Sequence, residues 1–179
     1  QHYPEMAMDA VVVDINQFHM LNERYGKHYA DDILRKIGER IRQAARKVGG
    51  VGCRQGADTF LLYCPFHEDY SPLMEQLAAD VAVDNSAADR VRLRMGVYPH
   101  VDKTLDIERR FDRARMAADS VKGGQSRAIG IYDARLHEAA LFRDRLLEDF
   151  HSSVESRRFK VYFQPKFDIR PDKPVLSSA

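Results

Sequence analysis

A long amphipathic helix, preceded by a short apolar strand, dominates the first third of this 179-residue chain. Residues 8–15 (MDAVVVDI) are β-branched and apolar, as a buried strand requires. From residue 30 onward the apolar side chains recur every three or four positions, which predicts a helix with one buried face. That face comprises Ala30, Ile33, Leu34, Ile37, Ile41, Ala44, Ala45 and Val48, and Gly49 and Gly50 end the helix. Such a helix must pack against a sheet to which the preceding strand belongs.

The other segments predict hairpins mixed with crossover helices. Residues 17–25 favour a short helix that ends at Gly26, and residues 53–64 a β-hairpin with its turn at 55–58. Further along, we expect a helix over 72–83, a half-buried strand over 91–97, a helix over 107–121 and a short strand over 129–132. The fold class expected is therefore α+β, a mostly antiparallel sheet of about five strands flanked by helices.

Composition and charge exclude several classes of protein. The apolar fraction of 44% and charged fraction of 31% are typical of a folded domain. A net charge of +1 and a pI near 8.0 argue against a nucleic-acid partner, because such domains usually carry a strongly basic face. No apolar run reaches the roughly 20 residues of a membrane helix, so we expect no membrane contact by this segment. Two cysteines make no disulfide framework, which favours a cytoplasmic setting.

Two acidic residues stand where chemistry could occur. Asp14 ends the first strand and Asp58 lies in the hairpin turn, so both carboxylates reach one end of the sheet if the strands are neighbours. Such a pair, joined by a backbone carbonyl, suits Mg²⁺, which prefers oxygen ligands. The alternative is purely structural: Asp14 caps the next helix and Asp58 suits a turn.

Residues 14–34 and 54–60 carry a resemblance to a known family. The first segment reads DINQFHMLNERYGKHYADDIL and the second RQGADTF. They resemble the GGDEF domains, the diguanylate cyclases, whose pattern is D-x-D-x-F-K-x-x-N-D-x-x-G-H-x-x-G-D-x-x-L followed by R-x-G-G-D-E-F. The resemblance covers about residues 8–133 and implies the palm-like, ferredoxin-like sandwich of that family.

The resemblance implies roles for particular residues. Asp14 and the backbone carbonyl of Ile15 match metal ligands, and Asp58 matches the acid that serves both the metal and the reacting hydroxyl. Asn22 and Asp31 match the residues that read guanine, although either could be an ordinary helix residue. Lys122 matches a phosphate-binding lysine, and His19 stands where another is expected; Lys122 could equally be a solvated residue. The implied ligands are GTP and Mg²⁺ or Mn²⁺, and cyclisation of two GTP molecules implies a homodimer.

Several positions depart from the family pattern. The signature reads Gly56, Ala57, Asp58, Thr59 and Phe60, so Thr59 removes one carboxylate from the metal site. Ala57 replaces a glycine, which costs roughly 1–2 kcal/mol if the position needs a positive φ. His19 lacks the permanent charge of lysine. Residues 47–50 (KVGG) replace the R-x-x-D of the product-inhibition site, so we expect none here.

The end of the chain predicts a second domain. Residues 159–166 (FKVYFQPK) look like the first strand of an EAL phosphodiesterase domain. We therefore expect a GGDEF-like domain over 1–133 without its N-terminal helix, a connector helix over 134–158, and the start of a truncated EAL domain over 159–179. The chain begins with Gln1 and reads as an excised part of a GGDEF–EAL protein, in which the EAL domain is a partner in the same chain.

Three functions remain open at this point. The first is a degenerate GGDEF domain that binds GTP and regulates the adjoining EAL domain with little or no cyclase activity. The second is an active cyclase that converts two GTP into cyclic di-GMP, with Asp58 as a catalytic residue. The third is a purely structural or dimerising module.

Overall fold

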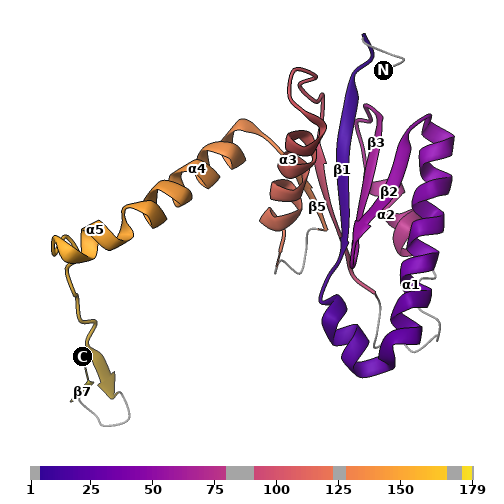
Figure 1. Ribbon diagram of the computed structural model, residues 1–179. Helices are drawn as coiled ribbons and strands as arrows, with labels where there is room; N and C mark the ends of the chain where they lie inside the picture. The colour runs from indigo at the N-terminus through magenta and orange to yellow at the C-terminus, as the bar shows by residue number, and fades with distance from the viewer. Residues whose placement is uncertain (1–4, 80–90, 123–127, 169–174, 179) are drawn as a thin grey trace. The chain divides into compact units, whose positions relative to one another are not determined.

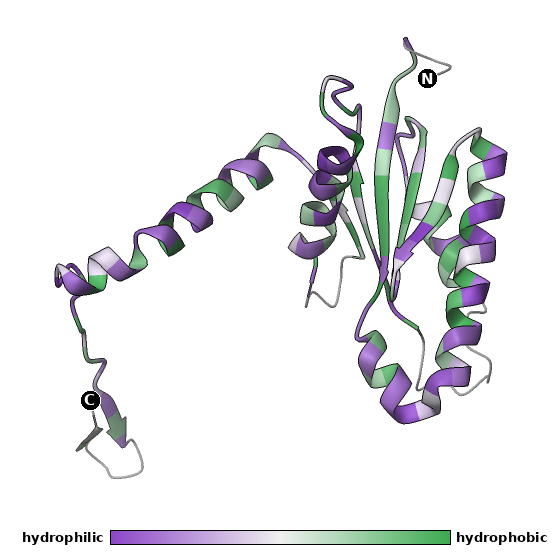
Figure 2. Ribbon diagram, viewed as in Figure 1, coloured by the Kyte–Doolittle hydropathy of each residue, from purple (hydrophilic) through white to green (hydrophobic). Residues whose placement is uncertain are grey.

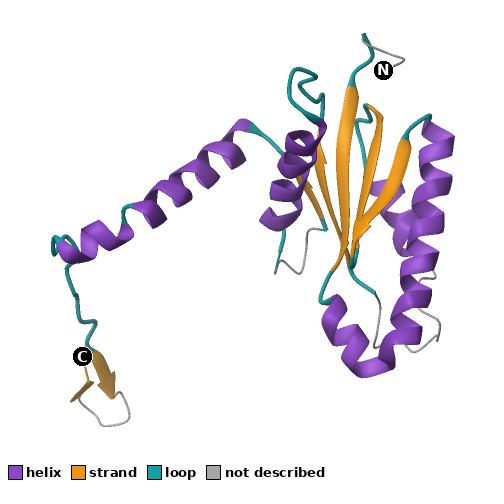
Figure 3. Ribbon diagram, viewed as in Figure 1, coloured by secondary structure: helices purple, strands orange, loops and turns teal. Residues whose placement is uncertain are grey.

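The chain forms two compact units, residues 1–137 and 138–179. A computed structural model describes residues 5–79, 91–122, 128–168 and 175–178 (Figures 1 and 3). The first unit contains eight elements in its described part, in the order β1 (Met8–Ile15), α1 (Phe18–Val48), β2 (Val51–Gly56), β3 (Thr59–Pro65), α2 (Ser71–Ala78), β4 (Leu93–Tyr98), α3 (Ile107–Ser120) and β5 (Ile129–Ile131).

These strands form one five-stranded sheet in the order β2-β3-β1-β4-β5. Strand β1 pairs antiparallel with β3 on one side and with β4 on the other, and only β4 and β5 run parallel among the described strands. The predicted α+β fold with a mostly antiparallel sheet is thus confirmed. The first strand lies at the centre of the sheet, which explains its continuous apolar run.

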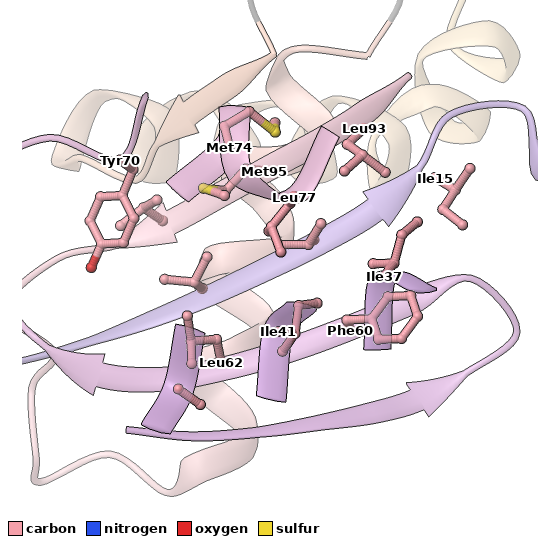
Figure 4. Close-up of a cluster of buried hydrophobic side chains, with 14 of the residues drawn as sticks. Ile15, Ile37, Ile41, Phe60, Leu62, Tyr70, Met74, Leu77, Leu93 and Met95 are labelled. Carbon is pink, nitrogen blue, oxygen red and sulfur yellow. The ribbon is translucent and has the colours of Figure 1, made fainter. Parts of the chain in front are cut away.

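Helices cover both faces of this sheet. Figure 2 shows hydrophobic residues concentrated in the strands, with hydrophilic residues interspersed along the helices. Helices α1 and α2 pack on one face, where Ile37, Phe60, Leu77 and Met95 belong to the larger buried cluster (Figure 4). Helix α3 packs on the other face against Val12 and its neighbours in a second cluster. The alternation along β1 thus divides its side chains between two cores.

Helix α1 contains the kink that the sequence predicted as a break. Gly26 has φ 79° and ψ 165°, which are not helical values, and the two halves continue on either side as one element. Gly26 sits in the positive-φ region that favours glycine. The rings of Tyr25 and Tyr29 lie 4.8 Å apart across the kink. Gly49 caps the far end with φ 68°, as predicted from its place after the apolar stripe.

Two glycines let helix α3 approach the sheet closely. A Cβ on Gly96 of β4 would lie 2.0 Å from the carbonyl oxygen of Ala114, and one on Gly130 of β5 would lie 2.0 Å from that of Ala117. Both contacts are far below van der Waals distance, so larger side chains cannot occupy either position without moving the helix. The small residues of α3 therefore place its C-terminal end directly over β4.

Two expectations for this unit need correction. Strand β4 is buried on both faces rather than half-buried, because helices cover the sheet on both sides where β4 crosses it; even Arg94 is buried. Helix α2 ends at Ala78, since Ala79 adopts an extended backbone with ψ 136°. The rest of the predicted helix, from residue 80 to 83, lies outside the described residues.

The second unit contains most of helix α4 (Ala134–Glu148), helix α5 (Phe150–Glu155) and the paired strands β6 (Lys166–Asp168) and β7 (Val175–Ser178). The predicted connector helix over 134–158 is interrupted at Asp149 and ends at Glu155. The strand expected over 159–166 is wrong at residues 159–165, which have no regular structure, and Tyr162 is 85% exposed; only Lys166 lies in a strand, β6. A strand needs a hydrogen-bonded neighbour, and in the described part of this unit the pairing is between β6 and β7.

None of the described helices combines the length and apolar character needed to cross a bilayer.

Candidate functional site

The two predicted acidic residues lie close together at one end of the sheet. Asp14 of β1 is in register with Thr59 of β3, which directly follows Asp58 in the β2–β3 turn. The amide of Ile15 donates a hydrogen bond of 3.4 Å to the carbonyl oxygen of Asp58. The end of β1, this turn and the C-terminal end of α3 lie at the same end of the sheet (Figure 1). The antiparallel β1–β3 pair therefore brings Asp14 and Asp58 together, as expected from the sequence.

The electrostatics of Asp58 reflect this proximity. Partial burial raises the pKa of the Asp58 carboxyl, and the negative charge of Asp14 raises it further. The positive charge of Arg94 acts in the opposite direction and offsets part of the rise in the pKa of Asp58. Two carboxylates and one guanidinium thus influence one another at this end of the sheet.

The signature turn is tightly closed. Ala57 has φ 30°, so the position does adopt a positive φ, where a side chain is strained. The Arg54 side chain reaches across the turn and donates from Nε to the Ala57 carbonyl oxygen at 3.0 Å, and from Nη2 to the same oxygen. From α3, the Nη2 atom of Arg115 donates to Oε1 of Gln55 at 2.5 Å. Arg54 therefore holds the backbone of the turn and Arg115 holds the Gln55 side chain, while Thr59 supplies no carboxylate.

Sequence reasoning missed Arg94. This residue lies on β4 directly opposite Asp14 in the register, and its Nη2 atom donates to Oδ2 of Asp14. Its Nη1 atom lies 3.8 Å from Oδ1 of Asp119 at the end of α3. The alternation of Arg92 and Arg94 with apolar residues predicts a half-buried strand, in which Arg94 would face solvent. Only the pairing of β4 with β1 reveals that Arg94 faces the acidic residues.

The residues present do not fit a divalent metal ion in this arrangement. Of the predicted ligands, the Asp14 carboxylate is already paired with the Arg94 guanidinium. Thr59 is neutral, and no group of three or more His, Cys, Asp or Glu side chains suited to a metal occurs among the residues that the structure describes. A divalent ion needs several oxygen ligands and a net negative site.

The predicted nucleotide-binding residues lie along α1 and after α3. Asn22 and Asp31 are both half-buried and stand on opposite sides of the Gly26 kink, while His19 is exposed in the first turn of α1. Lys122 is exposed just beyond α3, where its amide donates to the carbonyl oxygen of Asp119 at 3.1 Å. Asn22 and Asp31 are thus positioned by one kinked helix, and Lys122 follows the helix whose end meets Arg94. Their functional roles stay predictions.

Comparison with known proteins supplies the family. The model of the family "Diguanylate cyclase, GGDEF domain" matches residues 2–127 of the chain. The chain belongs to the GGDEF family. This match contains β1, α1, the β2–β3 turn and α3, and therefore every predicted site residue.

Individual relatives agree with this assignment. The bifunctional diguanylate cyclase/cyclic di-GMP phosphodiesterase MucR of Pseudomonas aeruginosa is 25% identical over 173 residues, which are 92% of this chain. The chain spans 24% of the length of the curated relatives it matches.

Two solved structures share the fold. An EAL/GGDEF domain protein from M. capsulatus superposes with a TM-score of 0.60 at 19% identity, covering 73% of this chain and 87% of that one. The active GGEEF domain of a diguanylate cyclase from Vibrio cholerae gives a TM-score of 0.60 at 20% identity, covering 72% of this chain and 84% of that one. At these identities the likeness establishes the fold alone.

Proposed function

We propose that this chain is a degenerate GGDEF domain of cyclic di-GMP signalling that binds GTP without cyclising it. The observation that carries the proposal is the contrast between two parts of the site. The signature turn has lost a carboxylate at Thr59 and carries a strained Ala57, whereas both predicted guanine-reading residues are present on α1. Base recognition can therefore persist where metal-assisted phosphoryl transfer cannot.

Guanine recognition by α1 is supported by chemistry as well as position. The carboxylate of Asp31 can accept from the N1–H and N2–H₂ groups of guanine, and the amide of Asn22 can bond its acceptor edge. Both side chains are half-buried, so they are neither locked in the core nor fully solvated. Lys122 is our proposed contact for the phosphates, with His19 as a weaker one.

A regulatory role for an adjoining EAL domain completes the proposal. MucR is named as both a cyclase and a phosphodiesterase, and the M. capsulatus protein as an EAL/GGDEF protein. This chain spans 24% of the length of MucR. We propose that an EAL phosphodiesterase domain lies in the same protein and is the partner that this domain regulates. We assign residues 134–158 to the connector and residues 159–179 to the beginning of that domain.

Calorimetric titration tests the nucleotide-binding part. We expect GTP to bind in the presence of Mg²⁺ and ATP not to bind, because the two bases present opposite donor and acceptor patterns to Asp31 and Asn22. Incubation with GTP should produce no cyclic di-GMP. A domain that ignores millimolar GTP would leave only the structural or dimerising function, and formation of cyclic di-GMP would establish the active cyclase.

A pair of neighbouring variants separates recognition from folding. We expect Asp31→Ala to abolish GTP binding and leave the melting temperature nearly unchanged, since the side chain is half-buried. Asp32→Ala is the matched control: Asp32 is exposed and pairs with Arg35 at 2.6 Å, so its loss should leave GTP affinity unaltered. A large fall in the melting temperature of Asp31→Ala would instead identify Asp31 as a structural residue.

A further inference from the structure

The end of the sheet where Asp14 and Asp58 lie contains a positively charged side chain, the guanidinium of Arg94. Arg94 and Asp14 occupy directly paired positions on β4 and β1, on the face covered by α3. Arg94 is 9% exposed, and the side chains of the pair are 11% and 17% exposed. A salt bridge this sheltered from water is screened far less than a surface pair.

The surroundings of Arg94 hold its guanidinium in place. Helix α3 lies against the sheet at Gly96, two positions further along β4, and its C-terminal end brings Asp119 to within 3.8 Å of Nη1. Among the described residues, Nε and Nη1 of Arg94 have no hydrogen-bond partner, so Asp14 provides its one hydrogen-bonded counter-charge. Burial of a charge is costly unless it is paired, and the guanidinium therefore requires the Asp14 carboxylate.

We propose that the Arg94 guanidinium is the resident cation of the Asp14–Asp58 site and excludes a divalent metal from it. Arginine stays protonated at every pH that a folded protein tolerates, so this cation is permanent. A metal ion bound by Asp14 would lie beside a fixed positive charge in a partly buried site, where repulsion between like charges is strong. It would also have to displace the guanidinium from its hydrogen-bonded partner.

This inference goes beyond the proposed function, because it does not depend on GTP. It explains the absence of a metal site by two residues on different strands: Thr59 supplies no negative charge where the family pattern has a glutamate, and Arg94 supplies a positive charge. Restoring the signature turn by Ala57→Gly and Thr59→Glu should therefore not restore metal binding while Arg94 remains.

A titration with Mn²⁺ in the absence of nucleotide tests the proposal, with bound and free Mn²⁺ distinguished by electron paramagnetic resonance. We expect no site-specific binding to the wild-type chain. Arg94→Ala should raise the affinity for Mn²⁺ at least about tenfold, and Arg94→Lys, which keeps the positive charge, should not. Adding Asp14→Asn to Arg94→Ala should abolish the gained binding, since the gained site uses that carboxylate.

Thermal unfolding of each variant, measured with and without Mn²⁺, shows whether the variant folds and whether it binds the ion. The ion should raise the melting temperature of Arg94→Ala and leave those of the wild type and Arg94→Lys unchanged. A folded Arg94→Ala that gains no Mn²⁺ affinity would overturn the proposal. So would Mn²⁺ binding by the wild type that disappears in Asp14→Asn, and this second measurement does not require Arg94→Ala to fold. Neither result bears on GTP binding, so the two proposals fail separately.

Discussion

Single residues at the end of β1 determine what this site can do. Asp14 and Asp58 lie close together, but Thr59 beside them is neutral and Arg94 pairs with Asp14. Thr59 occupies the position in register with Asp14 and brings no charge of its own. The chemistry of the site is therefore set by the neighbours of the two acidic residues.

The proximity of Asp14 and Asp58 should make the free energy of unfolding depend on pH. The pKa of Asp58 is raised in the folded chain above its ordinary value of 3.8. Below pH 3.8 the Asp58 carboxyl is protonated in both the folded and the unfolded state, and its favourable contribution to the free energy of unfolding is complete. As pH rises through the folded pKa, that contribution is lost, because the folded state must ionise a partly buried group beside Asp14.

Asp58→Asn carries no titrating group and should escape this loss. We expect its free energy of unfolding, relative to that of the wild type, to increase as pH rises from 3.5 to 7. Urea unfolding across this range measures the difference. Asp32→Asn, at an exposed position, serves as the control. A difference that stays constant or shrinks with rising pH would contradict the raised pKa of Asp58.

At the scale of elements, the site depends on how closely α3 lies against β4. Gly96 permits this approach, and the same packing places Asp119 next to Arg94. Helix α1 contributes differently: its kink at Gly26 separates the half that carries Asn22 from the half that carries Asp31. One helix thus carries the predicted base-reading residues, while another places Asp119 beside Arg94.

Gly96→Ala tests the close packing of α3. Its new Cβ would lie 2.0 Å from the Ala114 carbonyl oxygen, a backbone atom that cannot yield without a shift of the helix. We expect a loss of about 1–3 kcal/mol or more in the free energy of unfolding, measured with urea. Gly38→Ala is the matched control, because its Cβ would make an ordinary contact of 3.4 Å with Phe60. That variant should gain up to about 1 kcal/mol from helix propensity. Equal effects of the two changes would refute the role of Gly96.

At the scale of the whole molecule, the buried residues of both clusters lie in the first compact unit. They extend from Ala10 to Tyr132, whereas the described helices of the second unit have no buried residues. Side chains such as Phe142, Leu147 and Phe163 are largely exposed. The stability of the first unit therefore arises from its own two cores.

A chain shortened to residues 1–137 should fold independently. We expect one cooperative urea transition, with a free energy of unfolding within about 1 kcal/mol of that of the first unit in the full chain, since no core residue is removed. Circular dichroism of both chains measures this. Limited proteolysis of the full chain should cut first within residues 138–168. Loss of cooperative unfolding in the shortened chain would show that the second unit is required for folding.

Much of the fold and part of the site could be predicted from the sequence, because they depend on local spacing. The strand at 8–15, the helix with its break at Gly26, the cap at Gly49 and the hairpin turn all follow from residue periodicity and glycine placement. A hairpin also brings its turn close to the end of a neighbouring strand, so the proximity of Asp14 and Asp58 could be predicted from the sequence. The strand predicted over 159–166 was wrong at residues 159–165, because strand formation depends on a pairing partner that no local pattern specifies.

Only the tertiary structure decided the electrostatics of the site. Asp14 and Arg94 are 80 residues apart, and they meet because β4 lies beside β1 in the sheet. The order of strands in a sheet depends on contacts between segments far apart in the sequence, whereas the local alternation around Arg94 predicted that its side chain faces solvent. Local periodicity therefore determined the elements and the two acidic residues of this chain, whereas the strand pairing and the close packing of α3 determined the charge that faces them.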